Sequence, residues 1–256
     1  MRSCILMWKY PQMVVLTAVT AALYATAYIA LSPFSIDLVP GVLSFSIRTI
    51  FPMVFGILFG PAGAWGLGIG NIVGDLFTGS LALGSVFGFL SNALLGYLGF
   101  TLWSRFGPRP AQFDADVEDA PAGDRVRPVL TYLAIGVVAA AASAVVLAWG
   151  LDLLGFVPFR VVAVTLAANF VIGNWVGGLL YLLLHRRVRA MGVTWDEIMD
   201  LDEPPGRGPR ALLGTALVAV GGIAGWLVGI QLGGSDLLTP VVGVGFVAVL
   251  LGSLLL

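Results

Sequence analysis

Long apolar runs separated by short polar segments dominate the chain. A transmembrane helix needs about 20 mainly apolar residues, and the pattern predicts eight of them. They cover Met13–Ser32, Arg48–Phe59, Ala62–Phe77, Leu81–Phe106, Pro128–Leu151, Arg160–Leu184, Ala211–Leu232 and Leu237–Leu256. The apolar block from Arg48 to Thr78 is divided in two because it contains Gly60-Pro61, and a proline cannot continue a helix.

Three intervening segments are too polar to span a bilayer. Pro33–Ile47 is of mixed character, and we expect it to form a cap on the membrane surface. Gly107–Arg127 is an acidic linker. Arg186–Arg210 contains Thr194-Trp195-Asp196-Glu197, which is typical of the start of a short surface helix with Thr194 as N-cap. The predicted organisation is a six-helix membrane core at 1–190 with the linker at 107–127, a connector at 191–210 and a two-helix extension at 211–256.

The composition places the protein in a lipid bilayer. Hydrophobic residues make up 59% of the 256 residues and charged residues 11%, whereas soluble domains carry about 25% charged residues. The net charge of −1 attracts no nucleic acid. Cys4 and His185 are the single cysteine and histidine, too few for a cysteine- or histidine-based metal site. The prediction is an all-α integral membrane protein without a metal or cofactor of its own.

Basic residues indicate how the helices are oriented. If the N-terminus is cytoplasmic, eleven of the thirteen basic residues fall in inner segments, and only Arg48 and Arg160 fall in outer ones. Cytoplasmic loops of membrane proteins carry an excess of Lys and Arg. We therefore expect a multi-pass protein of the cell membrane with both termini and both long polar segments in the cytoplasm.

Several polar residues lie within the predicted helices, where they are costly and often functional. Asn71 and Asp75 are one turn apart on one helix face. With a rise of 1.5 Å per residue, Asn92 and Asn169 lie about 16 and 14 Å below the outer surface. Asn174 follows one and a half turns further.

These residues predict an outward-facing, substrate-binding pocket. Its charged rim would contain Asp75 and Arg48, together with Asp37, Asp152 and Arg160. Two alternatives remain open. Asparagines next to glycines also join helices by hydrogen bonds across tight interfaces, which is favoured for Asn71 and Asn174. Arg48 and Asp75 could form a simple interfacial ion pair.

The first predicted helix carries two overlapping pairs of alanines, and the two alanines of each pair are four residues apart. Ala18 and Ala22 form one pair, and Ala21 and Ala25 form the other. Such faces let another helix approach closely.

From the first helix to His185, the chain resembles a substrate-binding (S) component of an energy-coupling factor (ECF) vitamin transporter. The resemblance rests on the alanine-spaced first helix, the surface cap and the six-helix core with cytoplasmic ends. It rests also on Phe51–Ala64 (FPMVFGILFGPAGA), which is similar to the family's G-x-x-F-G-P-x-x-G turn. The two helices after Ala211 depart from the usual core.

The resemblance implies capture of a vitamin or related micronutrient from outside. It also implies docking on a transmembrane coupling subunit that works with two ATPases. Docking would use Ala18 and Ala22, and less surely Ala21 and Ala25. ATP would be hydrolysed by the partners, which agrees with the absence of a G-x-x-x-x-G-K-[ST] loop from this sequence.

Two other functions are compatible with the residues alone. The last two helices could complete a stand-alone transporter or channel for a small polar solute, although no inverted repeat supports this. An enzyme needs a positioned acid, base or nucleophile, and Asp75 with Arg48 is the single plausible nucleus for one. We expect a binding subunit rather than an enzyme.

Overall fold

The computed structural model describes residues 2–39, 43–108, 122–199, 201, 206 and 208–256. Most of the acidic linker predicted at 107–127 and part of the connector at 191–210 lie outside these residues.

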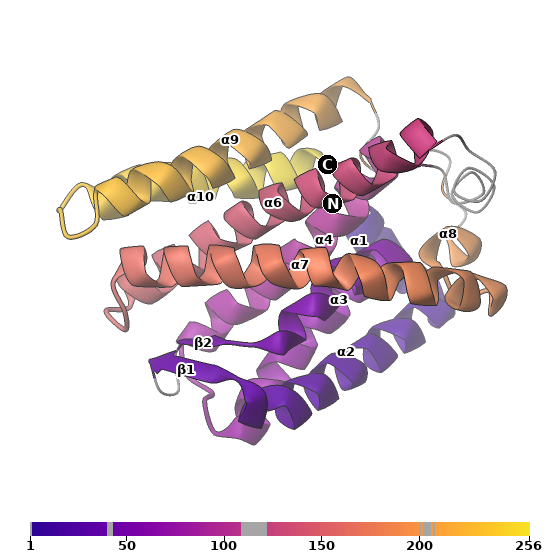
Figure 1. The fold of residues 1–256 in the computed structure, drawn as a ribbon, viewed down its shortest axis with the longest axis horizontal. Helices are drawn as coiled ribbons and strands as arrows, with labels where there is room; N and C mark the ends of the chain where they lie inside the picture. Colours follow the sequence, from indigo (N-terminus) through magenta and orange to yellow (C-terminus); the bar gives the residue numbers. More distant parts are fainter. Residues whose placement is uncertain (1, 40–42, 109–121, 200, 202–205, 207) are drawn as a thin grey trace.

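Long helices form most of the described chain and run roughly side by side (Figure 1). The helices are α1 (Arg2–Leu6), α2 (Pro11–Leu31), α3 (Phe51–Thr78), α4 (Gly84–Phe106), α6 (Ala122–Leu153), α7 (Phe159–Ala190), α8 (Trp195–Ile198), α9 (Pro209–Gln231) and α10 (Leu238–Leu255). Short 3₁₀ turns cover Met7–Lys9, Ser32–Phe34 and Ile47–Ile50. Within the described residues, seven helices are long and apolar enough to cross a membrane. The prediction of a helical, multi-pass membrane protein is confirmed, except that the chain predicted to be all-α also contains two short β-strands.

Helix α3 accounts for the difference between seven helices and the predicted eight. It contains the predicted break, because Gly60 has non-helical dihedral angles (φ 57°, ψ −127°) just before Pro61. A side chain at Gly63 would overlap the carbonyl of Phe55, whereas residues eight apart in a straight helix are separated by about 12 Å. The two arms of α3 therefore fold back on each other.

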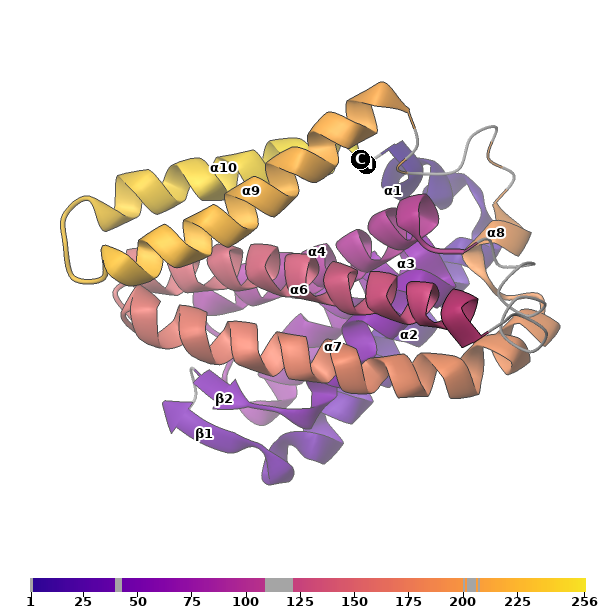
Figure 2. The same ribbon diagram turned by 45° about the horizontal axis from the view of Figure 1, so that its top comes forward.

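The cap predicted at Pro33–Ile47 contains a small β-hairpin that the hydropathy pattern does not reveal. Strands β1 (Ile36–Val39) and β2 (Leu43–Phe45) pair antiparallel, with Ile36 opposite Phe45. The hairpin lies beside the end of α2 and the start of α3 (Figures 1 and 2). Pro33 at the start and Pro40 in the middle of this segment disfavour a continuous helix, so the backbone bonds to itself as a pair of strands.

Helices α9 and α10 pack on α6 and α7 rather than standing apart (Figure 2). Two tryptophans contribute hydrogen bonds: Trp226 Nε1 donates to the carbonyl of Ala163 (2.9 Å) and Trp149 Nε1 to that of Thr239 (3.0 Å). The Trp149 ring also stacks on Phe246 with centroids 4.6 Å apart. Helices α9 and α10 are thus joined to the rest of the bundle by hydrogen bonds and ring contacts.

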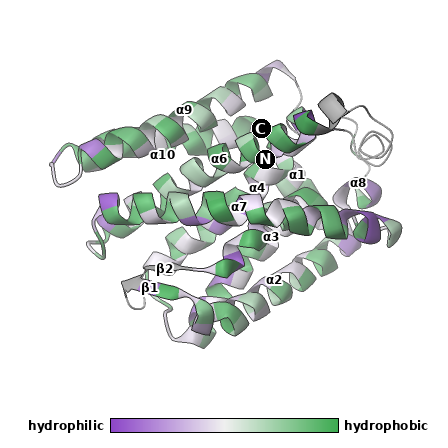
Figure 3. Cartoon of the chain, in the orientation of Figure 1, coloured by the Kyte–Doolittle hydropathy of each residue, from purple (hydrophilic) through white to green (hydrophobic). Residues whose placement is uncertain are grey.

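Hydrophobic residues predominate along the long helices (Figure 3). Leu23, Val220 and Val244 are large, apolar and exposed, as expected of residues that face lipid. Hydrophilic residues concentrate at the end that carries α8 and the last turns of α7. There Arg189 forms an ion pair with Asp196 (3.3 Å).

Candidate binding pocket

A cavity of about 580 Å³ lies at the end of the bundle near the β-hairpin. This volume is typical of small-molecule sites. Residues of α2, α3, α4, α6 and α7 line it, together with the cap and the 3₁₀ turn before α3. Five of the six predicted binding residues are among them: Asn92, Asn169, Asp75, Asn71 and Arg48.

The polar side of the cavity is a hydrogen-bonded network that joins three helices. The hydroxyl of Tyr24 on α2 donates to Oδ1 of Asn92 on α4 (2.7 Å). Nδ2 of Asn92 donates to Oδ1 of Asn71 on α3 (3.1 Å) and to the carbonyl of Gly88 (2.9 Å). These asparagines therefore join helices and line the cavity at the same time, so the two interpretations of the sequence do not exclude each other.

Asp75 extends this network and is 7% exposed. Its Oδ2 accepts from Nδ2 of Asn71 (3.0 Å), and its Oδ1 accepts from the hydroxyl of Tyr28 (2.6 Å). The neighbouring Gly74 has no side chain, which leaves room for the Tyr28 ring against α3. Through these two bonds Asp75 connects α3 to α2 at the cavity.

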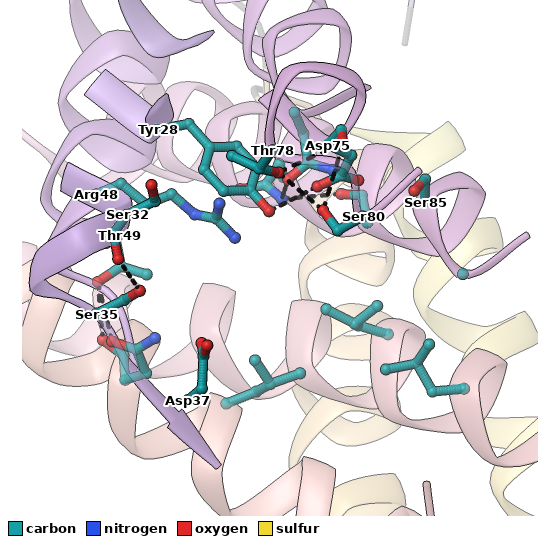
Figure 4. A pocket seen from close by; sticks show the side chains of 18 of the residues that line it. Tyr28, Ser32, Ser35, Asp37, Arg48, Thr49, Asp75, Thr78, Ser80 and Ser85 are labelled. Carbon is teal, nitrogen blue, oxygen red and sulfur yellow. Dashed lines mark hydrogen bonds between the residues drawn. The ribbon is translucent and has the colours of Figure 1, made fainter. Parts of the chain in front are cut away.

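Arg48 lies over Tyr28 instead of pairing with Asp75. Its Cζ is 3.3 Å from the centroid of the Tyr28 ring, a cation–π contact. Both Arg48 and Asp75 belong to the described residues, and no ion pair joins them within 4.0 Å. The predicted simple ion pair is wrong, since the tyrosine comes between the two charges. Figure 4 shows the ring and the guanidinium side by side at the cavity.

Asn169 on α7 also lines the cavity, next to the 3₁₀ turn that precedes α3. With the side-chain amide turned so that both of its polar atoms find partners, Nδ2 donates to the carbonyl of Ser46 (3.1 Å) and Oδ1 accepts from the N–H of Ser46 (3.1 Å). This amide holds the segment that leads directly into Arg48 and Thr49.

Asn174 lies away from the cavity. It is fully buried, and its Nδ2 donates to the carbonyl of Gly136 on α6 (3.0 Å). It therefore joins helices, as the alternative interpretation expects. Of the predicted rim, Asp37 lines the cavity, whereas Asp152 and Arg160 do not. Asp152 instead accepts from the N–H of Phe159 (2.8 Å).

Sequence reasoning missed the tyrosines and the apolar wall. Tyr24 and Tyr28 are one turn apart in the first span, a spacing that could have suggested a polar face directed inward. Leucines and phenylalanines form the wall: Leu147, Leu151, Phe156, Leu166 and Phe170. The cavity thus has one polar and one apolar side, which suits a flat ring with polar edges.

The four alanines of α2 do not share one surface. Ala18 and Ala22 are exposed. Ala21 (8% exposed) and Ala25 (5%) are buried, and the carbonyl of Ala21 lies against Gly70 of α3. Only the first pair is accessible to a partner helix.

A family model described as QueT transporter matches residues 14–186. The chain belongs to the QueT transporter family. QueT is an ECF-type S component for queuosine precursors, so the resemblance to S components is confirmed. The match indicates a transporter rather than an enzyme.

The QueT match extends from α2 to the last turns of α7, and it includes every helix that lines the cavity. Helices α9 and α10 lie beyond it. No curated protein and no solved structure matches the chain.

Proposed function

We propose that this QueT chain captures a queuosine precursor from outside the cell and delivers it to an ECF-type importer. In the importer, a transmembrane coupling subunit and two ATPases would supply the energy. The observation that carries the proposal is the cavity with the Asn71–Asn92–Asp75 network on one side and an apolar wall on the other.

The chemistry of such a ligand suits this cavity. Queuosine is a guanosine-type nucleoside, so its precursors are guanine-like bases with apolar faces and a polar edge. That edge carries N–H donors and a carbonyl acceptor. Asp75 and the asparagine amides would meet the edge, while Leu147 and Phe170 would meet a face. Ligand pockets commonly combine apolar walls with a few placed polar groups.

The proposed orientation places the cavity outside. Helix α7 begins at Phe159 near the cavity and ends beyond the basic run Arg186–Arg189. The positive-inside tendency assigns that basic end to the cytoplasm, which supports cytoplasmic N- and C-termini. We further propose that the coupling subunit docks on the exposed Ala18–Ala22 face of α2.

Calorimetry on the purified protein tests capture directly. We expect stoichiometric binding of a queuosine precursor and no binding of an unrelated vitamin such as riboflavin. A folded protein that binds no queuosine precursor would contradict the proposal.

The alternative of a stand-alone transporter rests on α9 and α10, which lie beyond the family match. Proteoliposomes separate the two functions. An S component should accumulate ligand only when the coupling subunit and ATPases are present and ATP is supplied. Ligand uptake by the chain alone would favour the alternative.

A further inference from the structure

One charged nitrogen at the cavity lacks an acceptor. Nη1 of Arg48 is buried and, among the residues that the structure describes, has no hydrogen-bond partner. Buried polar groups are nearly always hydrogen-bonded, and the exceptions call for an explanation. Because Arg48 lines a cavity, a bound ligand is the natural source of the missing acceptor.

The neighbouring carboxylates do not supply it. The oxygens of Asp75 accept hydrogen bonds from Tyr28 and Asn71, and no ion pair within 4.0 Å joins Asp75 to Arg48 in the described residues. Asp37 lies on the cap strand and is directed toward the same space (Figure 4), but no ion pair within 4.0 Å joins it to Arg48 in the described chain. The Tyr28 ring lies against the guanidinium plane, yet Nη1 of Arg48 still has no acceptor among the described residues.

The charges at the cavity indicate which kind of acceptor fits. One arginine, Arg48, lines the cavity together with two acidic residues, Asp37 and Asp75, so the formal charges of these three residues sum to −1 (one positive charge minus two). A negatively charged ligand would be repelled by this balance. A neutral carbonyl oxygen satisfies the guanidinium without adding charge.

We propose that Arg48 is a specificity-determining residue that donates to the ring carbonyl of a guanine-like base. The proposal rests on the function proposed above and adds the group that distinguishes an oxo from an amino substituent. An amino group at that ring position would direct its N–H donors at the N–H groups of Arg48. Nη1 of Arg48 would then still lack an acceptor. Sites built to hydrogen-bond one group reject analogues that lack it.

The test compares two ligands by calorimetry. One is the queuosine precursor, and the other is the analogue in which an amino group replaces its ring carbonyl. We expect wild-type protein to bind the precursor at least about tenfold more tightly. In Arg48→Gln, precursor affinity should fall about 10- to 100-fold and the difference between the two ligands should largely disappear. Arg48→Lys should give an intermediate result, because it keeps the charge but loses the planar fork.

Arg160→Gln is the matched control, since Arg160 begins α7 near the same end and does not line the cavity. It should leave both affinities unchanged. A wild-type protein that binds both ligands equally would overturn the proposal without any variant, as would an Arg48→Gln or Arg48→Lys protein that keeps the full difference. If wild-type protein binds neither ligand, the proposed function itself fails.

Discussion

The hydroxyl of Tyr28 lies 2.6 Å from Oδ1 of Asp75 and joins α2 to α3 across 47 residues of sequence. The same ring supports the guanidinium of Arg48. One tyrosine therefore contacts both the carboxylate and the cation of the cavity, and its position depends on the absence of a side chain at Gly74.

Tyr28→Phe should weaken ligand binding. The variant keeps the ring beneath Arg48 but removes one donor from a buried carboxylate, and a hydrogen bond to a charged group contributes about 1.5–3 kcal/mol. We expect the Kd for a queuosine precursor to rise about tenfold. Tyr132→Phe is the control, because the Tyr132 hydroxyl is buried without a partner among the described residues. It should leave the Kd unchanged, and an equal loss in both variants would contradict the assignment.

Substitution of Asn92 should lower ligand affinity, whereas substitution of Asn174 should lower only the stability of the protein. Asn92→Ala removes the amide that joins Tyr24 to Asn71, so we expect at least about tenfold weaker binding. Asn174→Ala removes a bond to Gly136 outside the cavity. It should lower stability by about 1 kcal/mol and leave affinity intact. Calorimetry and thermal unfolding in detergent measure the two effects, and loss of affinity in Asn174→Ala would show that the cavity extends further.

Tryptophan substitutions on α2 should separate docking from folding. Ala18→Trp and Ala22→Trp enlarge exposed positions, so the proteins should fold and bind ligand while uptake with the coupling subunit and ATPases is lost. Ala21→Trp and Ala25→Trp overpack buried positions, which costs about 1–3 kcal/mol or more. Those two should show a lower Tm. Normal uptake by the first pair would mean that the partner docks elsewhere.

Gly60→Ala should destabilise the protein at the reversal of α3. Gly60 has a φ of 57°, and an added Cβ would lie 2.7 Å from Cγ of Trp195. Strained backbone of this kind costs about 1–3 kcal/mol, and displacement of Trp195 adds to it. Gly79→Ala is the comparison, because its φ is 75° but nothing lies within 4 Å of the added Cβ. We expect Gly60→Ala to have the lower Tm of the two.

Cys4 should react slowly with thiol reagents in the folded protein. Burial raises the pKa of its thiol to about 11, and the thiolate is the reactive form. Maleimide labelling at pH 8 should therefore be slow and should accelerate as the pH rises toward 11. Denaturation in sodium dodecyl sulfate should make labelling fast at pH 8. Rapid labelling of native protein at pH 8 would show that Cys4 is exposed.

The amino-acid sequence alone was enough to predict the class of protein and the position of most membrane helices. A long apolar run in a bilayer forms a helix, because every backbone N–H and C=O group must find its hydrogen-bond partner within the protein. It also located the break at Gly60-Pro61, because proline and positive-φ glycine act locally. Asn71, Asn92 and Asp75 could be chosen as candidate site residues because polar groups within a bilayer are costly and often functional.

Which polar and small residues face one another depends on how the helices pack, and this could not be predicted from the sequence. Asn169 and Asn174 are five residues apart on α7, yet one lines the cavity and the other bonds to α6. Hydropathy does not reveal such a difference, because the lipid and the protein core are both apolar. For the same reason it did not separate Ala18 from Ala21. How far each helix is rotated depends on side chains supplied by distant segments, such as the Tyr28 ring that packs against Gly74.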